Sequence, residues 1–179
     1  SEAGGMGWMG AAYQTPDEIL AQAERIRALT DKPFGINLFA GGWNRQVRHD
    51  LEPMLGLLAE AHAELGLEPP VAPPLPVDPF PAQLEAVLEV RPAMFSFTFG
   101  LPRDEELRRL RDAGILIAGT ATSLREAVIL KDAHVHAIFV QGCEAGAHRG
   151  TFAGAFETAM HPTLGLVAAV RHAVDLPLI

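Results

Sequence analysis

Residues 15–39 read TPDEILAQAERIRALTDKPFGINLF, and this stretch holds one complete unit of a helix followed by a strand. Thr15 suits a helix N-cap and Pro16 its first turn, and two acidic residues follow, so a helix is predicted from Thr15 to about Leu29. The apolar run at 34–39 predicts a short buried strand. Continuous apolar strands joined by helices are typical of a parallel sheet covered by helices.

The same alternation extends to both sides of this unit. Further strands are predicted at 5–12, 93–99, 115–119 and 137–140, and residues 176–179 have the pattern of one more strand opening. Further helices are predicted at 51–65 (ended by Gly66), 82–90, 103–113, 123–132 and 163–174. Right-handed crossovers leave two arrangements for such a chain, a barrel or an open doubly wound sheet.

Both ends of the sequence have the pattern of interrupted elements. Ser1 to Ala3, before Gly4 and Gly5, resemble the last turn of a helix, and residues 176–179 stop inside a strand. A closed eight-stranded barrel needs about 250 residues. We therefore expect residues 1–179 to form the central part of an α/β (β/α)8 TIM barrel, about strands 2 to 7.

Composition narrows the classes of partner. The 179 residues carry a net charge of -8, which argues against a nucleic-acid backbone or an anionic membrane surface as partner. The single cysteine, Cys143, allows no intrachain disulfide. No apolar run of about 18 residues and no signal-peptide pattern occurs, so the expected location is the cytoplasm.

Residues 69–81 hold half of the prolines of the chain. The stretch has two interpretations, a polyproline ligand for another protein or a rigid surface connection. Apolar residues interrupt it and a predicted helix follows at once, which favours the connection.

Polar and glycine residues gather where the predicted strands end. In parallel barrels chemistry collects at these carboxyl ends. The loop that follows the strand at 137–140 reads QGCEAGAHRG at 141–150, and its small residues would let a flat ligand approach the backbone next to His148. The residues at the strand ends are Asn37, Thr98, Gly100, Gly119, Thr120, Gln141 and Gly142.

Each of these residues also has a structural interpretation. Asn37 could be a buried amide satisfied by neighbouring backbone, and Gln141 could cap a loop. His148 could be solvated, Arg149 a surface charge, and Cys143 a small half-buried filler. The functional interpretation rests on all of them reaching one end of one sheet.

A metal site also needs weighing, because His134, His136, Cys143, Glu144 and His148 lie within a short stretch. His134 and His136 precede their strand, so they belong to the end of the sheet opposite His148. Ligands of one ion must converge, and we therefore predict no metal site.

Five segments resemble successive motifs of one enzyme family, the nitronate monooxygenases, formerly called 2-nitropropane dioxygenases. The most specific is QGCEAGAHRG at 141–150, which is similar to the family's loop of the form Q-G-x-E-A-G-G-H-R-G. The other four are AGGMG at 3–7, PFGINLF at 33–39, FSFTFG at 95–100 and GTAT at 119–122. The segments span nearly the whole chain in the family's order.

The resemblance implies a TIM-barrel flavoprotein that binds FMN without a covalent bond. It assigns flavin contacts to Asn37, Gln141 and Gly146 and the catalytic base to His148. Ala147 departs from the family's second glycine, which is tolerable unless that position requires a positive φ. The family's first strand and its later FMN-phosphate loops have no counterpart in residues 1–179, which would make this chain part of an FMN-binding domain.

The implied reaction is the oxidation of alkyl nitronates, and of nitroalkanes, by O2 to carbonyl compounds and nitrite. His148 would remove the α-proton of a neutral nitroalkane. Phe39, Trp43, Phe97 and Phe99 are expected to supply an apolar mouth, although strand alternation lets only some of them face inward. The resemblance leaves a homodimer open.

Two rival functions remain at this point. One is an NAD(P)H-dependent FMN reductase of the same superfamily, an enoyl-thioester (enoyl-ACP) or quinone reductase. The other is a non-catalytic barrel that has lost its flavin.

Overall fold

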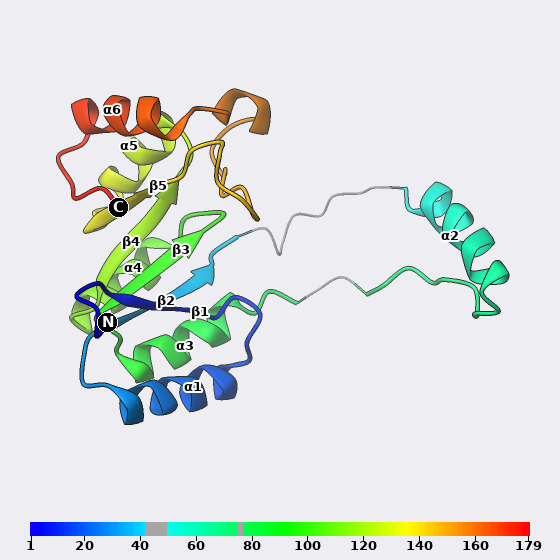
Figure 1. Ribbon diagram of the computed structural model, residues 1–179, viewed down its shortest axis with the longest axis horizontal. Coiled ribbons are helices and arrows are strands. Elements are labelled where there is room, and N and C mark those ends of the chain that lie inside the picture. The colour runs from blue at the N-terminus through cyan, green and yellow to red at the C-terminus, as the bar shows by residue number, and fades with distance from the viewer. Residues whose placement is uncertain (42–49, 75–76) are drawn as a thin grey trace. The chain divides into compact units, whose positions relative to one another are not determined.

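The computed structural model describes residues 1–41, 50–74 and 77–179. The chain divides into two units, residues 1–42 with 79–179, and residues 43–78. The first unit holds one parallel sheet whose strand order follows the sequence (Figure 1). A doubly wound sheet reverses its strand order at a switch point, so the sequential order is that of a barrel wall. Its strands are β1 (Gly7–Gly10), β2 (Phe34–Phe39), β3 (Met94–Thr98), β4 (Leu116–Ala121) and β5 (Ala137–Val140).

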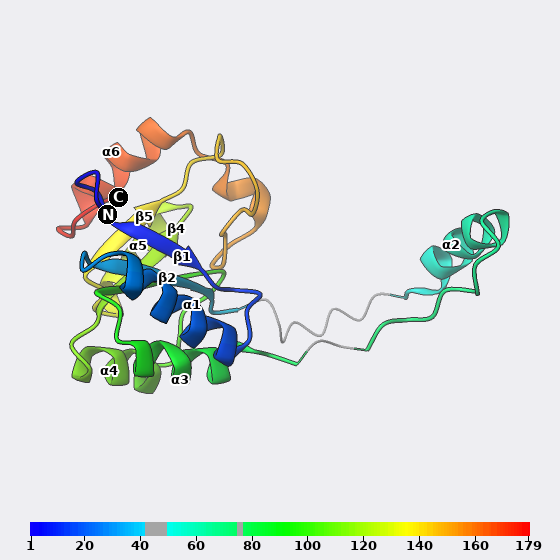
Figure 2. The same cartoon turned by 60° about the horizontal axis from the view of Figure 1, so that its bottom comes forward.

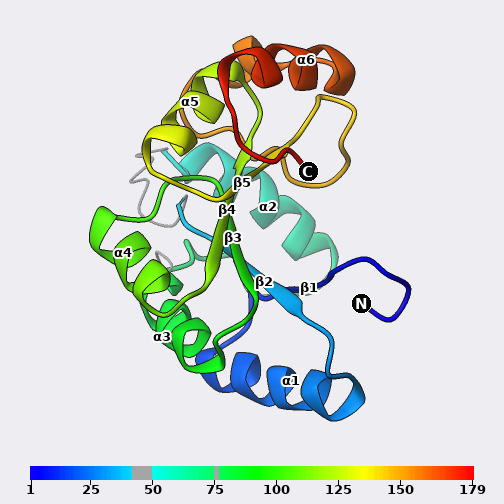
Figure 3. The ribbon, with the colours of Figure 1, turned by 90° about the vertical axis from the view of Figure 1, so that its left-hand side faces the viewer.

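The helices of this unit form an arc around one face of the sheet (Figure 3). The predicted capping of the first helix is confirmed, because Thr15 and Glu18 bond each other's backbone amides in a capping box. The predicted strand at 176–179 is represented by a parallel bridge between Leu178 and Ile138 of β5. The helices are α1 (Pro16–Leu29), α3 (Phe80–Val90), α4 (Asp104–Asp112), α5 (Leu124–Asp132) and α6 (Thr163–Ala173), with a 3-10 turn at Phe156–Ala159.

Most predicted elements differ from the observed ones by two residues or fewer at their ends. β4 runs two residues past the predicted Gly119, which places Thr120 inside the strand. α3 begins two residues earlier than predicted, because Pro81 suits the first turn of a helix.

The second unit contains one described helix, α2 (Glu52–Glu64). None of its residues is buried, and Met54 and Leu57 are among its exposed apolar side chains. The chain leaves the helix through Gly66, whose φ of 68° is the left-handed conformation expected after a helix end. The described residues of the proline-rich stretch before α3 form neither helix nor strand, which agrees with a connection.

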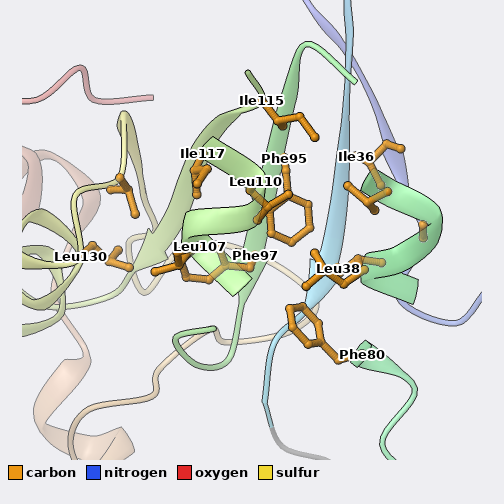
Figure 4. Packing of buried hydrophobic residues seen from close by; sticks show 14 of the residues in the cluster. Ile36, Leu38, Phe80, Phe95, Phe97, Leu107, Leu110, Ile115, Ile117 and Leu130 are labelled. Carbon is orange, nitrogen blue, oxygen red and sulfur yellow. The ribbon is translucent and has the colours of Figure 1, made fainter. Parts of the chain in front are cut away.

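The hydrophobic core lies between the sheet and its helices (Figure 4). Strand alternation sends every second side chain to this side, and Ile36, Leu38, Phe95 and Ile117 are fully buried there. Gly119 belongs to the same face, because a Cβ at this position would overlap Leu130 of α5.

The opposite face of the sheet is concave. Trp8 of the first strand and Phe139 of the fifth meet edge to face across it, with ring centroids 5.2 Å apart. Gly35 provides the space for this contact, because a Cβ there would run into the Trp8 ring. The five strands therefore curve strongly enough for their two outer members to touch, as in the wall of a barrel.

Candidate active site

The loop after β5 lies at the end of the sheet toward which the strands point (Figures 1 and 2, gold to orange). Gly150 brings this loop down onto the inner face of the sheet. A Cβ on Gly150 would lie 2.8 Å from Cγ2 of Thr98 and 3.1 Å from Cγ2 of Thr120, so only glycine fits. The hydroxyls of these two threonines are 3.1 Å apart and join β3 to β4 at this level.

Polar side chains of neighbouring strands meet on the inner face below that loop. Asn37 pairs in register with Ser96, and its amide donates a 2.8 Å hydrogen bond to the serine hydroxyl. The Oδ1 atom of Asn37 has no partner among the described residues. Asn37 is thus bonded to a side chain, not to backbone, and keeps one acceptor for a ligand.

A cavity of about 610 Å³ opens over this polar row. Asn37 and Gln141, two of the predicted flavin contacts, both line it, whereas His148 and Gly146 do not. Its size falls within the range of small-molecule and cofactor sites. The remaining lining residues are Trp8, Ser96, Thr120, Phe139, Val140, Gly142, Glu144, Ala145, Thr163 and Ile179.

Gln141 connects the cavity to the His148 loop. Its Nε2 donates to the carbonyl of His148 at 3.0 Å, and its Oε1 accepts from the amide of Gly150 at 2.7 Å. The loop-capping interpretation of Gln141 is therefore correct. It does not exclude a ligand contact, because Nε2 carries a second hydrogen and the residue lines the cavity.

The imidazole of His148 is exposed and sits among three aromatic rings. The centroids of Phe39, Phe99 and Tyr13 lie 5.4, 5.7 and 6.5 Å from that of the imidazole. Phe97, which was expected near the mouth, is instead 1% exposed and packs in the core against Phe95, because alternation turns it toward the helices. Trp43, the fourth expected mouth residue, lies outside the described residues.

Two residues beside His148 adopt left-handed backbone conformations without being glycine. Ala147 has φ 60° and Phe99 has φ 71°. The sequence predicts that alanine is tolerable at position 147 unless the position requires a positive φ. The φ of Ala147 is positive, so this residue is strained, because L-residues disfavour the left-handed region. Such conformations persist only where the surroundings impose them, and they are common at functional sites.

Gly146 lies in the same loop with open space around it. A Cβ at this position would meet nothing within 4 Å, and φ of Gly146 is not positive. The backbone conformation that favours glycine thus falls on position 147, not on position 146.

Arg149 is not the surface charge that was expected. Its side chain is half-buried and donates to the carbonyls of Gln141, Gly142, Thr122 and Ala159. This one guanidinium holds together the loop, the end of β4 and the 3-10 turn. It can do so because a guanidinium group carries five N–H donors.

Glu126, in the first turn of α5, anchors the same loop from below. Its fully buried carboxylate accepts from the backbone amides of Phe152 and Ala153 at 2.6 and 2.9 Å. It also accepts from the backbone amide and the hydroxyl of Thr122, both at 2.7 Å. Hydrogen bonds to a carboxylate are stronger than hydrogen bonds between neutral groups. Glu126 therefore fixes the loop backbone at Phe152 and Ala153, where the loop leaves the site.

Glu144 links the loop to the start of α6. Its carboxylate accepts from the backbone amide of Thr163 at 2.9 Å and from the hydroxyl at 2.8 Å. Hydrogen bonds from its own backbone amide and from Thr163 hold the pKa of Glu144 below its usual value. Gly142 leaves room for this contact, because a Cβ there would overlap the Thr163 hydroxyl.

The histidines before β5 take no part in the site. Nδ1 of His136 accepts a 3.0 Å hydrogen bond from the amide of Ile117, which is a structural role. Within the described residues no group of three or more His, Cys, Asp or Glu side chains is placed to hold a metal ion. Cys143 is half-buried, as expected.

Among the helices that the structure describes, none has the length and apolar character needed to cross a bilayer.

The sequence interpretation missed three contributors, Ser96, Tyr13 and Glu126. Ser96 stands between two phenylalanines, so alternation could have placed it on the inner face. Glu126 follows Ser123 at the capping-box spacing, which signals a helix start but not a long-range anchor. Tyr13 lies in a loop, and nothing in the sequence signalled its contact with a residue 135 positions away.

The family model described as "Nitronate monooxygenase" matches residues 1–179. A "Probable nitronate monooxygenase" of Staphylococcus haemolyticus (strain JCSC1435) is 32% identical over 175 residues, covering 98% of this chain and 49% of that protein. The chain thus spans about half the length of the curated relatives that it matches.

Two solved structures agree with the fold. The crystal structure of nitroalkane oxidase from Streptomyces ansochromogenes is 37% identical with a TM-score of 0.84, covering 99% of this chain and 51% of that one. FabK from Thermotoga maritima is 22% identical with a TM-score of 0.67, covering 99% and 43%. The second likeness shows the fold alone. The predicted TIM-barrel architecture is confirmed.

Proposed function

The chain belongs to the nitronate monooxygenase family, and from this premise we propose that it serves the FMN-dependent oxidation of alkyl nitronates and nitroalkanes by O2. The products would be carbonyl compounds and nitrite. The observation that carries the proposal is the polar inner face, where Asn37 and Gln141 line one cavity next to the loop of His148. We propose that residues 1–179 form part of the FMN-binding barrel. The first strand and the phosphate-binding loops of that barrel would lie outside these residues.

The cavity has the features that an isoalloxazine ring requires. Trp8 and Phe139 give it aromatic walls, while Asn37, Thr120 and Gln141 offer amide and hydroxyl groups to a ring edge rich in nitrogen and oxygen. The Oδ1 atom of Asn37 and the second hydrogen of the Gln141 amide are the groups that we assign to flavin recognition. Gly146 does not line the cavity, so we base flavin recognition on Asn37 and Gln141.

Bound FMN would supply the redox chemistry, accepting electrons from the electron-rich nitronate and passing them to O2. The protein's own task with a nitronate is to orient it and to keep water away. Phe39 and Phe99, which meet edge to face with centroids 4.8 Å apart, provide an apolar wall for this.

A neutral nitroalkane needs one further step, because it must first lose its α-proton. We assign this step to His148, because a neutral imidazole is suited to general-base catalysis. Its exposure and its place at the rim of the sheet leave it open to a small substrate. A nitronate arrives already deprotonated, so His148 should matter mainly for neutral substrates.

The test compares the two substrate types in His148→Ala, made in the longest polypeptide that the gene encodes. General-base catalysis contributes about 100-fold or more, so nitroalkane turnover should fall by at least that factor. Nitronate turnover should stay within a few-fold of wild type. An equal loss on both substrates would defeat the assignment. His172→Ala is the matched control, since His172 is an exposed histidine of α6, and it should preserve both activities.

A further inference from the structure

The aromatic surroundings of His148 come from the end of one strand and from the loops after two others. Tyr13 follows β1, Phe39 ends β2 and Phe99 follows β3. Tyr13 and Phe39 also meet edge to face, with centroids 5.6 Å apart. A small shift of any one loop would therefore change the position of the imidazole.

The loop that carries Tyr13 is held from below by a buried amide. Gln83 of α3 is 1% exposed, and its Nε2 donates to the carbonyls of Ala11, Ala12 and Gln14 at 3.3, 3.1 and 2.7 Å. This side chain fixes the backbone on both sides of Tyr13. The backbone of Tyr13 is therefore held in one position, although the ring of Tyr13 is exposed.

The loop that carries Phe99 is equally constrained. A Cβ on Gly41 would overlap the carbonyl oxygen of Phe99, and a Cβ on Gly100 would lie 3.2 Å from the carbonyl of Ala40. This close approach of two backbones accompanies the left-handed conformation of Phe99. The rings around His148 are thus placed by packed backbone.

The contact between Tyr13 and His148 has a chemical consequence. The phenol oxygen lies 3.3 Å from Nε2 of the imidazole. A neutral imidazole carries one N–H and one lone pair, and which nitrogen holds the hydrogen depends on the hydrogen bonds it makes. If Nε2 donated its hydrogen to the phenol oxygen, Nδ1 would keep the lone pair. Nδ1 has no partner among the described residues.

We infer that Tyr13 is a positioning residue that accepts a hydrogen bond from Nε2–H of His148 and leaves Nδ1 as the nitrogen that takes the substrate's proton. The inference rests on the proposed function for its kinetic consequence, but the hydrogen bond itself does not. Tyr13 does not touch the reacting atoms. It holds the ring, and with the hydrogen bond in this direction the lone pair stays on Nδ1, which has no partner among the described residues.

The first measurement is nitrogen-15 NMR of the histidine side chains in the wild-type protein at mildly alkaline pH, where imidazoles are neutral. His148 should show a protonated Nε2 and an unprotonated Nδ1. His136 provides an internal reference, because its Nδ1 accepts from backbone and must be unprotonated. A neutral His148 protonated at Nδ1 would overturn the inference.

The second measurement uses Tyr13→Phe, which removes the hydroxyl and keeps the ring. The Nε2–H signal of His148 should shift or be lost to exchange with water, while His136 stays unchanged. Loss of one hydrogen bond to the base should lower nitroalkane turnover about 3- to 10-fold, with nitronate turnover unchanged. Thr158→Val, which removes an exposed hydroxyl from the 3-10 turn, should change neither.

Three results would contradict the role of Tyr13. They are an unchanged His148 signal in Tyr13→Phe, unchanged nitroalkane turnover, and an equal loss on both substrates. If the wild-type protein oxidised neither substrate, the proposed function would fail, and the NMR measurement would still decide the hydrogen bond.

Discussion

Replacing Ala147 by glycine should stabilise the protein, although it removes a side chain. The φ of Ala147 is 60°, a conformation that costs an L-residue about 1 to 2 kcal/mol and costs glycine almost nothing. Glycine also makes the unfolded chain more flexible, which takes back about 0.4 to 1 kcal/mol. The net gain in the free energy of unfolding should be about 0.7 kcal/mol, or about 2 °C in Tm for a chain of this size.

A second glycine variant in the same loop isolates the strain. Ala145→Gly deletes the same methyl group three residues before His148, but Ala145 does not have a positive φ. This variant should lose about 0.4 to 1 kcal/mol. Because both variants share the unfolded-state term, the difference between them measures the strain itself, about 1 to 2 kcal/mol.

The assay is urea and thermal unfolding of protein prepared without FMN, so that the proposed cofactor does not enter the result. Ala147→Gly should unfold at a higher midpoint than wild type and Ala145→Gly at a lower one. If both variants lost stability equally, the left-handed conformation at position 147 would carry no strain and the reasoning would be refuted.

Two further predictions concern the carboxylates that hold the loop. Glu126→Ala should cost about 3 kcal/mol, because the partly buried amides of Phe152 and Ala153 and the buried Thr122 all lose their acceptor. Glu18→Ala should cost much less, since Glu18 occupies the equivalent N3 position of α1 but is exposed; equal losses would show that the loop contacts of Glu126 add nothing. Glu144→Gln should be less stable than wild type at neutral pH and equal to it in acid. The pKa of Glu144 is lowered in the folded state, so its contribution is present above the ordinary glutamate pKa and is lost as pH falls through the folded value. A stability difference that does not change with pH would contradict this.

Local signals in the sequence were sufficient to predict most of the fold. The Thr15 cap, the proline at the start of α1 and the apolar run of β2 each act within a few residues, and the observed elements match them. The choice between a barrel and a doubly wound sheet depended on strand order. That order is set by packing between distant residues, such as Trp8 against Phe139, which no local pattern encodes.

The candidate site was predictable to the extent that it follows strand ends. Asn37 and Gln141 reach one cavity because parallel strands deliver their carboxyl ends to one edge. The roles of Arg149 and Glu126 were not predictable, since their partners are backbone groups of folded loops. Phe97 was misplaced because Ser96 and Thr98, its neighbours in β3, face inward and alternation turns Phe97 toward the helices, a pattern already visible in the polar residues at 96 and 98.

The most direct test of the central claim is the visible absorption spectrum of the purified protein, in the longest form that the gene encodes, titrated without oxygen. We predict a bound-flavin spectrum that is bleached rapidly by an alkyl nitronate such as propionate 3-nitronate and recovers when O2 is admitted. A colourless protein that takes up no FMN, or a flavin that only NADPH bleaches, would contradict the account.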